Sequence, residues 1–201
     1  AARVDYLLMR HRLEYRKKSL ATDQRKLAEI EELVGFKNGV LELYEGYRQR
    51  GPMEGRPTAE KLAQIQKAVS TLEGRIALKA SEGKLATTAV LALRAQKVVG
   101  ELQRQLDGWY GFYAGFDPQF SWWVKQPYGE LKEELGAYRK KLGELVTGGK
   151  KGGEAPLIGD PIGAAALADD LAVEMLSYSP VELLAIGERE FAWCRAEMEK
   201  A

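Results

Sequence analysis

The chain has 201 residues, of which 45% are hydrophobic and 29% are charged, and its formal net charge is +1. It is long enough to bury a sizeable core as one domain or as a closely packed pair of domains. No apolar run approaches the roughly 18 residues of a membrane span, and the balanced charge does not indicate nucleic acid. We therefore expect a soluble protein that binds no nucleic acid and has no membrane span.

The two halves of the chain differ in the sign of their charge. Residues 1–100 hold 19 Lys and Arg against 12 Asp and Glu, whereas residues 101–201 hold 11 against 17. Opposite charge favours packing of the halves against each other. Both ends of the sequence lie inside helical patterns, without an apolar signal core at the start or a stop signal at the end. We expect a fragment or a processed chain whose partner is the remainder of its own polypeptide or a second chain.

The first half of the sequence has the spacing of amphipathic helices. Apolar residues at three- and four-residue steps predict a helix or a helix pair from residue 4 to 34 and a short helix from 40 to 47. Thr58 is a suitable N-cap for the next helix, which should stop at Gly83. That helix has a narrow, coiled-coil-like seam, formed by Leu62, Ile65, Val69, Leu72 and Ile76.

A third long helix, from about Leu85 to Tyr113, leads into an aromatic-rich connection at residues 109–128, WYGFYAGFDPQFSWWVKQPY. Its glycines and prolines predict that the chain turns and enters a new helix near Tyr128. A stacking surface for nucleic acid needs interleaved basic residues, and this segment has only Lys125. An aromatic core or a groove lining is the better interpretation.

The last part of the chain combines a glycine-rich loop with two helix starts. TGGKKGGE within residues 147–156 predicts a flexible linker. Asp160 before Pro161 is a candidate N-cap, and Ser179 with Glu182 forms a complete capping-box pattern. We predict an all-α bundle of about six to eight helices, with residues 1–146 and the helix pair at 157–201 packed as one domain.

The sequence contains no convincing catalytic or metal-binding pattern. His11 is the only histidine, and zinc-binding spacings are absent. Cys194, the only cysteine, follows Trp193 on an apolar helix and is interpreted as a buried small hydrophobic residue. The adjacent pair Asp169 and Asp170 diverges by about 100° on a helix and is expected to be solvated. No residue is therefore assigned a catalytic or metal-ligating role.

The stretch GDPIG…EMLSYSPVELLAIGEREFAWC, preceded by FDPQFSWWVKQPY and VDYLLMRHRLEY, resembles the bacterial and fungal proteins of domain-of-unknown-function family 885. The resemblance extends over almost the whole chain and is most specific in the last forty residues and around Trp122 and Trp123. It implies a helical protein related to zinc-dependent peptidases, whose zinc-binding helix lies downstream of this region. Ala165 departs from the family, whose members often have Glu there.

From this resemblance we expect a non-catalytic helical portion of a peptidase- or amidase-like metallohydrolase. It would form one wall of a cleft for a small, peptide-like substrate, and a downstream zinc-bearing part would complete that cleft. The candidate cleft residues are Trp122, Trp123, Tyr128, Asp160 and Gly163. The alternative is a self-contained helical scaffold or protein-interaction module without enzyme activity.

Overall fold

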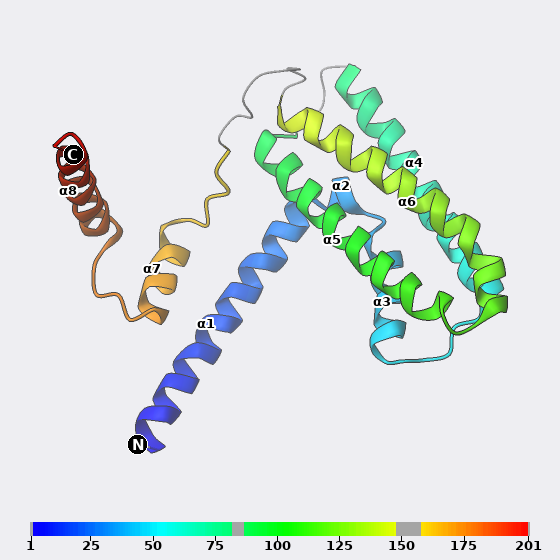
Figure 1. Ribbon diagram of the computed structural model, residues 1–201, viewed down its shortest axis with the longest axis horizontal. Helices are drawn as coiled ribbons and strands as arrows, with labels where there is room; N and C mark the ends of the chain where they lie inside the picture. Colours follow the sequence, from blue (N-terminus) through cyan, green and yellow to red (C-terminus); the bar gives the residue numbers. More distant parts are fainter. Residues whose placement is uncertain (1, 82–86, 148–157, 201) are drawn as a thin grey trace. The chain divides into compact units, whose positions relative to one another are not determined.

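A computed structural model describes residues 2–81, 87–147 and 158–200 of the chain. These residues form eight α-helices and no strand, which confirms the predicted all-α class (Figure 1). The helices are α1 (Ala2–Glu29), α2 (Glu31–Val34), α3 (Lys37–Arg48), α4 (Gly55–Ser81), α5 (Ala89–Ala114), α6 (Pro118–Val146), α7 (Ala164–Val173) and α8 (Pro180–Met198). Among the described residues, no helix has the length and apolar character needed to cross a membrane. Apart from Thr147, the predicted linker lies outside these residues.

The chain divides into two compact units. Unit 1 combines Ala1–Lys26 with Asp160–Ala201, and unit 2 is Leu27–Gly159. Every buried side chain in the described residues belongs to unit 2, and the described part of unit 1 has none. The hydrophobic core of the protein therefore lies in unit 2. The predicted packing of residues 157–201 on the first 146 residues as one domain stays a prediction.

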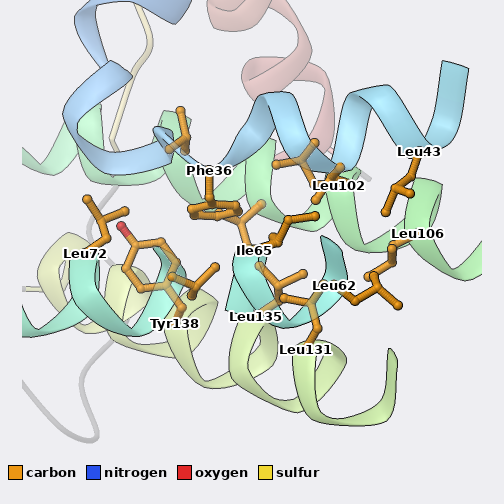
Figure 2. Close-up of a cluster of buried hydrophobic side chains, with 14 of the residues drawn as sticks. Phe36, Leu43, Leu62, Ile65, Leu72, Leu102, Leu106, Leu131, Leu135 and Tyr138 are labelled. Carbon is orange, nitrogen blue, oxygen red and sulfur yellow. The ribbon is translucent and has the colours of Figure 1, made fainter. Parts of the chain in front are cut away.

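The core of unit 2 is built around α6, which packs against both α4 and α5. In Figure 1, α4 and α6 run side by side in the same direction, while α5 runs opposite to α6. Figure 2 shows the side chains that these helices and α3 turn toward one another. The labelled ones are Phe36, Leu43, Leu62, Ile65, Leu72, Leu102, Leu106, Leu131, Leu135 and Tyr138. The predicted seam of α4 is thus buried from Leu62 to Leu72.

Two predicted helix starts in unit 2 are wrong. Thr58 is not an N-cap, because α4 already begins at Gly55 and the Thr58 amide donates to the Glu54 carbonyl at 3.2 Å. The helix after the aromatic segment begins at Pro118 rather than near Tyr128. Asp117 caps it by accepting from the Gln119 amide at 2.8 Å. A capped helix with proline in its first turn is favourable.

Pro127 lies inside α6, where sequence reasoning places a break. Proline removes one intrahelical hydrogen bond and usually kinks or ends a helix. Here Phe120 and Val124 precede it and Leu131 follows it on the same buried face. Burial of these side chains on α4 and α5 outweighs the local preference of proline.

The two predicted helix starts in unit 1 have different outcomes. Asp160 is not an N-cap, because α7 begins at Ala164 and its cap is Gly163, at a φ of 89° that favours glycine. The capping box of α8 is confirmed. The Ser179 amide donates to Glu182 Oε2 at 2.7 Å, and the Glu182 amide donates to Ser179 Oγ at 3.3 Å.

Candidate functional site

Trp122 and Trp123 lie in the second turn of α6, which buries Phe120 and Val124. Because successive helical residues point about 100° apart, burial of those two side chains turns Trp122 outward. Its side chain is 75% exposed. The two indole rings are in edge-to-face contact, with centroids 4.8 Å apart. They form one aromatic surface on unit 2.

The start of α4 holds Trp123 in place. A Cβ atom at Gly55 would lie 3.1 Å from Cδ1 of Trp123, so glycine permits the close approach of α4 and α6 here. The Arg56 guanidinium lies 6.0 Å from the ring centroid of Trp123, within the range of a cation–π interaction. Trp123 is thus held by both helices, while Trp122 remains accessible.

Tyr128 is engaged within unit 2 and is less available to a substrate. Its ring stacks on Tyr110, with centroids 3.8 Å apart and planes inclined by 7°. Its hydroxyl donates to Asp107 Oδ1 at 2.6 Å. Burial, together with the Asp107 carboxylate, raises the pKa of Tyr128. The Lys132 Nζ atom lies 3.1 Å from Asp107 Oδ1, and this carboxylate raises the pKa of Lys132.

Asp160 and Gly163 belong to unit 1, where Asp160 pairs with Lys26 at 3.2 Å. Two further contacts join α1 to α7 nearby: the Tyr15 hydroxyl donates to Asp170 at 2.8 Å and Lys18 pairs with Asp169 at 2.6 Å. The hydrogen bond to Asp170 raises the pKa of Tyr15. Tyr15, Lys18, Lys26, Asp169 and Asp170, but neither Asp160 nor Gly163, line a cavity of about 120 Å³. Its other lining residues are Ser19, Thr22, Asp23, Ile162 and Ala166.

Sequence reasoning missed these contacts and treated Asp169 and Asp170 as solvated. Their partners are 151 and 155 residues away in the sequence, so no local pattern links them. One signal was present on α1: Tyr15, Lys18 and Thr22 recur at three- and four-residue steps and share a face. That spacing predicts a polar contact face but not the residues that meet it.

The cysteine prediction is also wrong. Cys194 is exposed rather than buried, because α8 does not turn its apolar side chains into a core. His11 is exposed on α1. Within the described ranges, no group of three or more His, Cys, Asp or Glu side chains could hold a metal ion. The His, Cys, Asp and Glu side chains of the described ranges therefore do not fit a zinc ion, and no step of a zinc reaction is assigned to them.

The structure brings together two of the five candidate cleft residues. Trp122 and Trp123 form one exposed surface, Tyr128 is occupied by Tyr110 and Asp107, and Asp160 and Gly163 lie in the other unit. Comparisons of the chain with models of known protein families, with curated proteins and with solved structures found no match.

Proposed function

We propose that this chain is a non-catalytic helical portion of a peptidase- or amidase-like metallohydrolase. In this proposal, Trp122 and Trp123 form part of one wall of a cleft for a small, peptide-like substrate. A zinc-bearing part of the same polypeptide completes the cleft. The resemblance of the last forty residues and of the Trp122 region to family 885 supports the reaction class.

The observation that carries the proposal is the exposure of Trp122 beside an ordered Trp123. Two aromatic rings in contact at the surface give a ligand a broad apolar area to cover, and burying aromatic surface is favourable. The Arg56 guanidinium lies beside Trp123 and pairs with the Glu60 carboxylate at 3.2 Å, so a substrate carboxylate would compete with Glu60 for it. An aromatic wall with a neighbouring guanidinium suits a peptide-like substrate, which combines apolar side chains with a carboxylate.

Two measurements test the proposal. The chain alone, supplied with zinc, should not hydrolyse peptide or amide substrates, and zinc-dependent turnover by it would contradict the assignment. The protein encoded by the whole reading frame should hydrolyse them. In that protein, Trp122→Ala should raise KM roughly five- to thirtyfold, which corresponds to about 1–2 kcal/mol for a lost aromatic contact.

The matched control is Trp193→Ala, which removes another exposed indole, on α8 in unit 1. It should leave KM unchanged. Equal effects of the two substitutions would mean that Trp122 acts through stability rather than through substrate contact. A reading frame without a zinc-binding His-Glu…His-His helix would reject the metallohydrolase assignment itself.

The second candidate function is a helical scaffold or protein-interaction module without enzyme activity. The observation in its favour is the exposed apolar surface of unit 1, where many large apolar side chains of α1 and α8 face solvent. Apolar surface of this kind is typical of interaction sites. The reading frame separates the two candidates, because a scaffold requires no zinc-bearing part.

A further inference from the structure

Two helices of unit 1 carry matching apolar stripes. On α1, Tyr6, Leu13 and Leu20 recur at intervals of seven residues and are 48–66% exposed. On α8, Leu184, Phe191 and Met198 recur at the same interval and are 64–80% exposed. In coiled coils, helices pair lengthwise through two apolar positions in every seven residues, and each of these helices has one position that is apolar at every repeat. Each stripe extends over about 21 Å, at about 1.5 Å per residue, so the two have equal length.

The stripe on α1 lies on the side of the helix away from α7. Tyr15, Lys18 and Lys26 contact the aspartates at 170, 169 and 160. At about 100° per residue, that face and the stripe of Tyr6, Leu13 and Leu20 lie about 150° apart. The segment that leads into α8 is therefore held on one side of α1 while the stripe faces the other. This arrangement favours an occupant from outside the chain.

The charges of the two helices favour pairing of α1 with α8 over pairing of either helix with its own kind. Residues 3–18 of α1 carry six Lys and Arg against two Asp and Glu. Residues 180–198 of α8 carry four Glu against two Arg. Two copies of α1, or two copies of α8, would bring like charges together, whereas α1 with α8 brings opposite charges together.

We propose that the occupant is a second copy of this chain: α8 of one copy packs lengthwise on α1 of the other. Leu184, Phe191 and Met198 then cover Tyr6, Leu13 and Leu20. Each copy has one stripe of each kind, so a twofold dimer contains two identical contacts and leaves neither stripe exposed. The proposal is independent of the proposed function, which concerns Trp122 and Trp123 in unit 2.

Sedimentation of the full chain over a range of concentrations tests the dimer. The chain should change reversibly from monomer to dimer, and raising the salt concentration should weaken the dimer because opposite charges attract less strongly. Leu13→Gln and Phe191→Gln should each weaken dimerisation at least tenfold with an unchanged circular dichroism spectrum, since both side chains are exposed in the single chain. Phe116→Gln, at an equally exposed residue of unit 2, is the control and should not weaken it. A chain that stays monomeric, or a dimer unaffected by the first two substitutions, overturns the proposal.

Mixing the two variants identifies which helices pair. A heterodimer of Leu13→Gln and Phe191→Gln chains retains one contact in which both stripes are intact. The mixture should therefore associate more strongly than either variant alone. Pairing of α1 with α1, or of α8 with α8, predicts that one variant alone would dimerise like the parent, and that result would overturn the proposal.

A disulfide test separates a second copy from the chain's own α8. Leu13 and Phe191 are the middle residues of their stripes, so they meet in either helix direction. The variant Leu13→Cys/Phe191→Cys/Cys194→Ser, which removes the native cysteine, should form disulfide-linked dimers on oxidation. An intrachain disulfide instead would show that α8 of the same chain covers α1 and would overturn the proposal.

Discussion

Tyr138 places a polar group in the core of unit 2. It is 1% exposed, and its hydroxyl donates to the Leu33 carbonyl at 2.7 Å. Its ring also contacts Phe36 edge to face, with centroids 6.0 Å apart. A single side chain thus joins α6 to α2 and to the residue before α3 by one polar contact and one aromatic contact.

Replacing Tyr138 with phenylalanine keeps the ring and removes the hydrogen bond. We expect Tyr138→Phe to lower the free energy of unfolding by about 1–2 kcal/mol, because a buried hydrogen bond is lost without a change in packing. Urea denaturation measures the change. Tyr44→Phe is the control, since its hydroxyl has no hydrogen bond among the described residues, and it should have little effect. Equal effects would mean that the Leu33 contact contributes nothing specific.

Burial raises the pKa of Tyr138 above its ordinary value. The folded protein therefore binds the phenolic proton more tightly than the unfolded chain, whose tyrosines titrate near about pH 10. The contribution of the protonated Tyr138 to the free energy of unfolding is complete below that pH and is lost as the pH rises above it. We expect the urea midpoint of the parent protein to fall between about pH 9 and pH 11. The fall should be smaller in Tyr138→Phe; an identical fall would contradict the assignment to this residue.

At the scale of elements, α3 and α4 approach closely at Gly39. A Cβ atom there would lie 2.7 Å from Cγ1 of Ile65. We expect Gly39→Ala to destabilise the protein by about 1–3 kcal/mol, since overpacking costs more than the helix propensity of alanine returns. Gly74→Ala is the matched control on α4, where a Cβ atom meets nothing within 4 Å. It should stabilise by about 0.5–1 kcal/mol. Thermal melting of both variants checks the opposite signs.

The start of α8 depends on its own capping box. We expect Ser179→Ala to weaken the first turn of α8 by about 0.5–2 kcal/mol, because the Glu182 amide loses its acceptor. Hydrogen exchange of the amides at residues 181–183 should accelerate, while exchange in α6 stays unchanged. Ser177→Ala, two residues earlier and outside the box, is the control. Faster exchange in both variants would mean that the box does not hold this turn.

The same box makes the start of α8 sensitive to acid. Hydrogen bonds from the Ser179 backbone and side chain lower the pKa of Glu182. The carboxylate is therefore the form of Glu182 that stabilises the helix start. Its contribution is fully present above the pKa of glutamate in the unfolded chain, about 4.3. It is lost as the pH falls through the lower pKa that Glu182 has in the folded protein. The first turn of α8 should loosen under acid conditions before unit 2 unfolds.

At the scale of the whole molecule, burial differs sharply between the two units. All buried residues among those described lie between Ile30 and Leu142, in unit 2. Segments with few buried apolar contacts open at low free energy. Limited trypsin digestion should therefore cut the part of α1 in unit 1, or α8, before it cuts α4, α5 or α6. Arg189 and Arg195 on α8 and Lys132 and Lys140 on α6 offer cleavage sites in both units. First cuts inside α6 would contradict the lower stability expected for unit 1. The digestion is done on diluted, monomeric protein, so that dimerisation does not protect α1 and α8.

The sequence by itself determined the all-α class, the buried seam of α4 and the cap of α8. The three- and four-residue spacing of Leu62, Ile65, Val69 and Leu72 depends only on the 3.6-residue period of a helix, so it predicts which face is buried. The Ser179 box spans four residues and needs no distant partner. For the candidate site, the sequence predicts an aromatic core or a groove lining at residues 109–128, a segment that contains Trp122 and Trp123.

Only the tertiary structure decided how the remaining groups are used. It continued α6 through Pro127, because packing on α4 and α5 outweighs the proline, and it paired Asp160 with Lys26 instead of capping a helix with it. It also left Cys194 and the stripe of α8 exposed. The first two outcomes depend on contacts between residues far apart in the sequence. The exposure of Cys194 and of the α8 stripe depends on the absence of buried side chains in the described part of unit 1. The local spacing of residues carries no information about distant contacts or about burial in the folded chain.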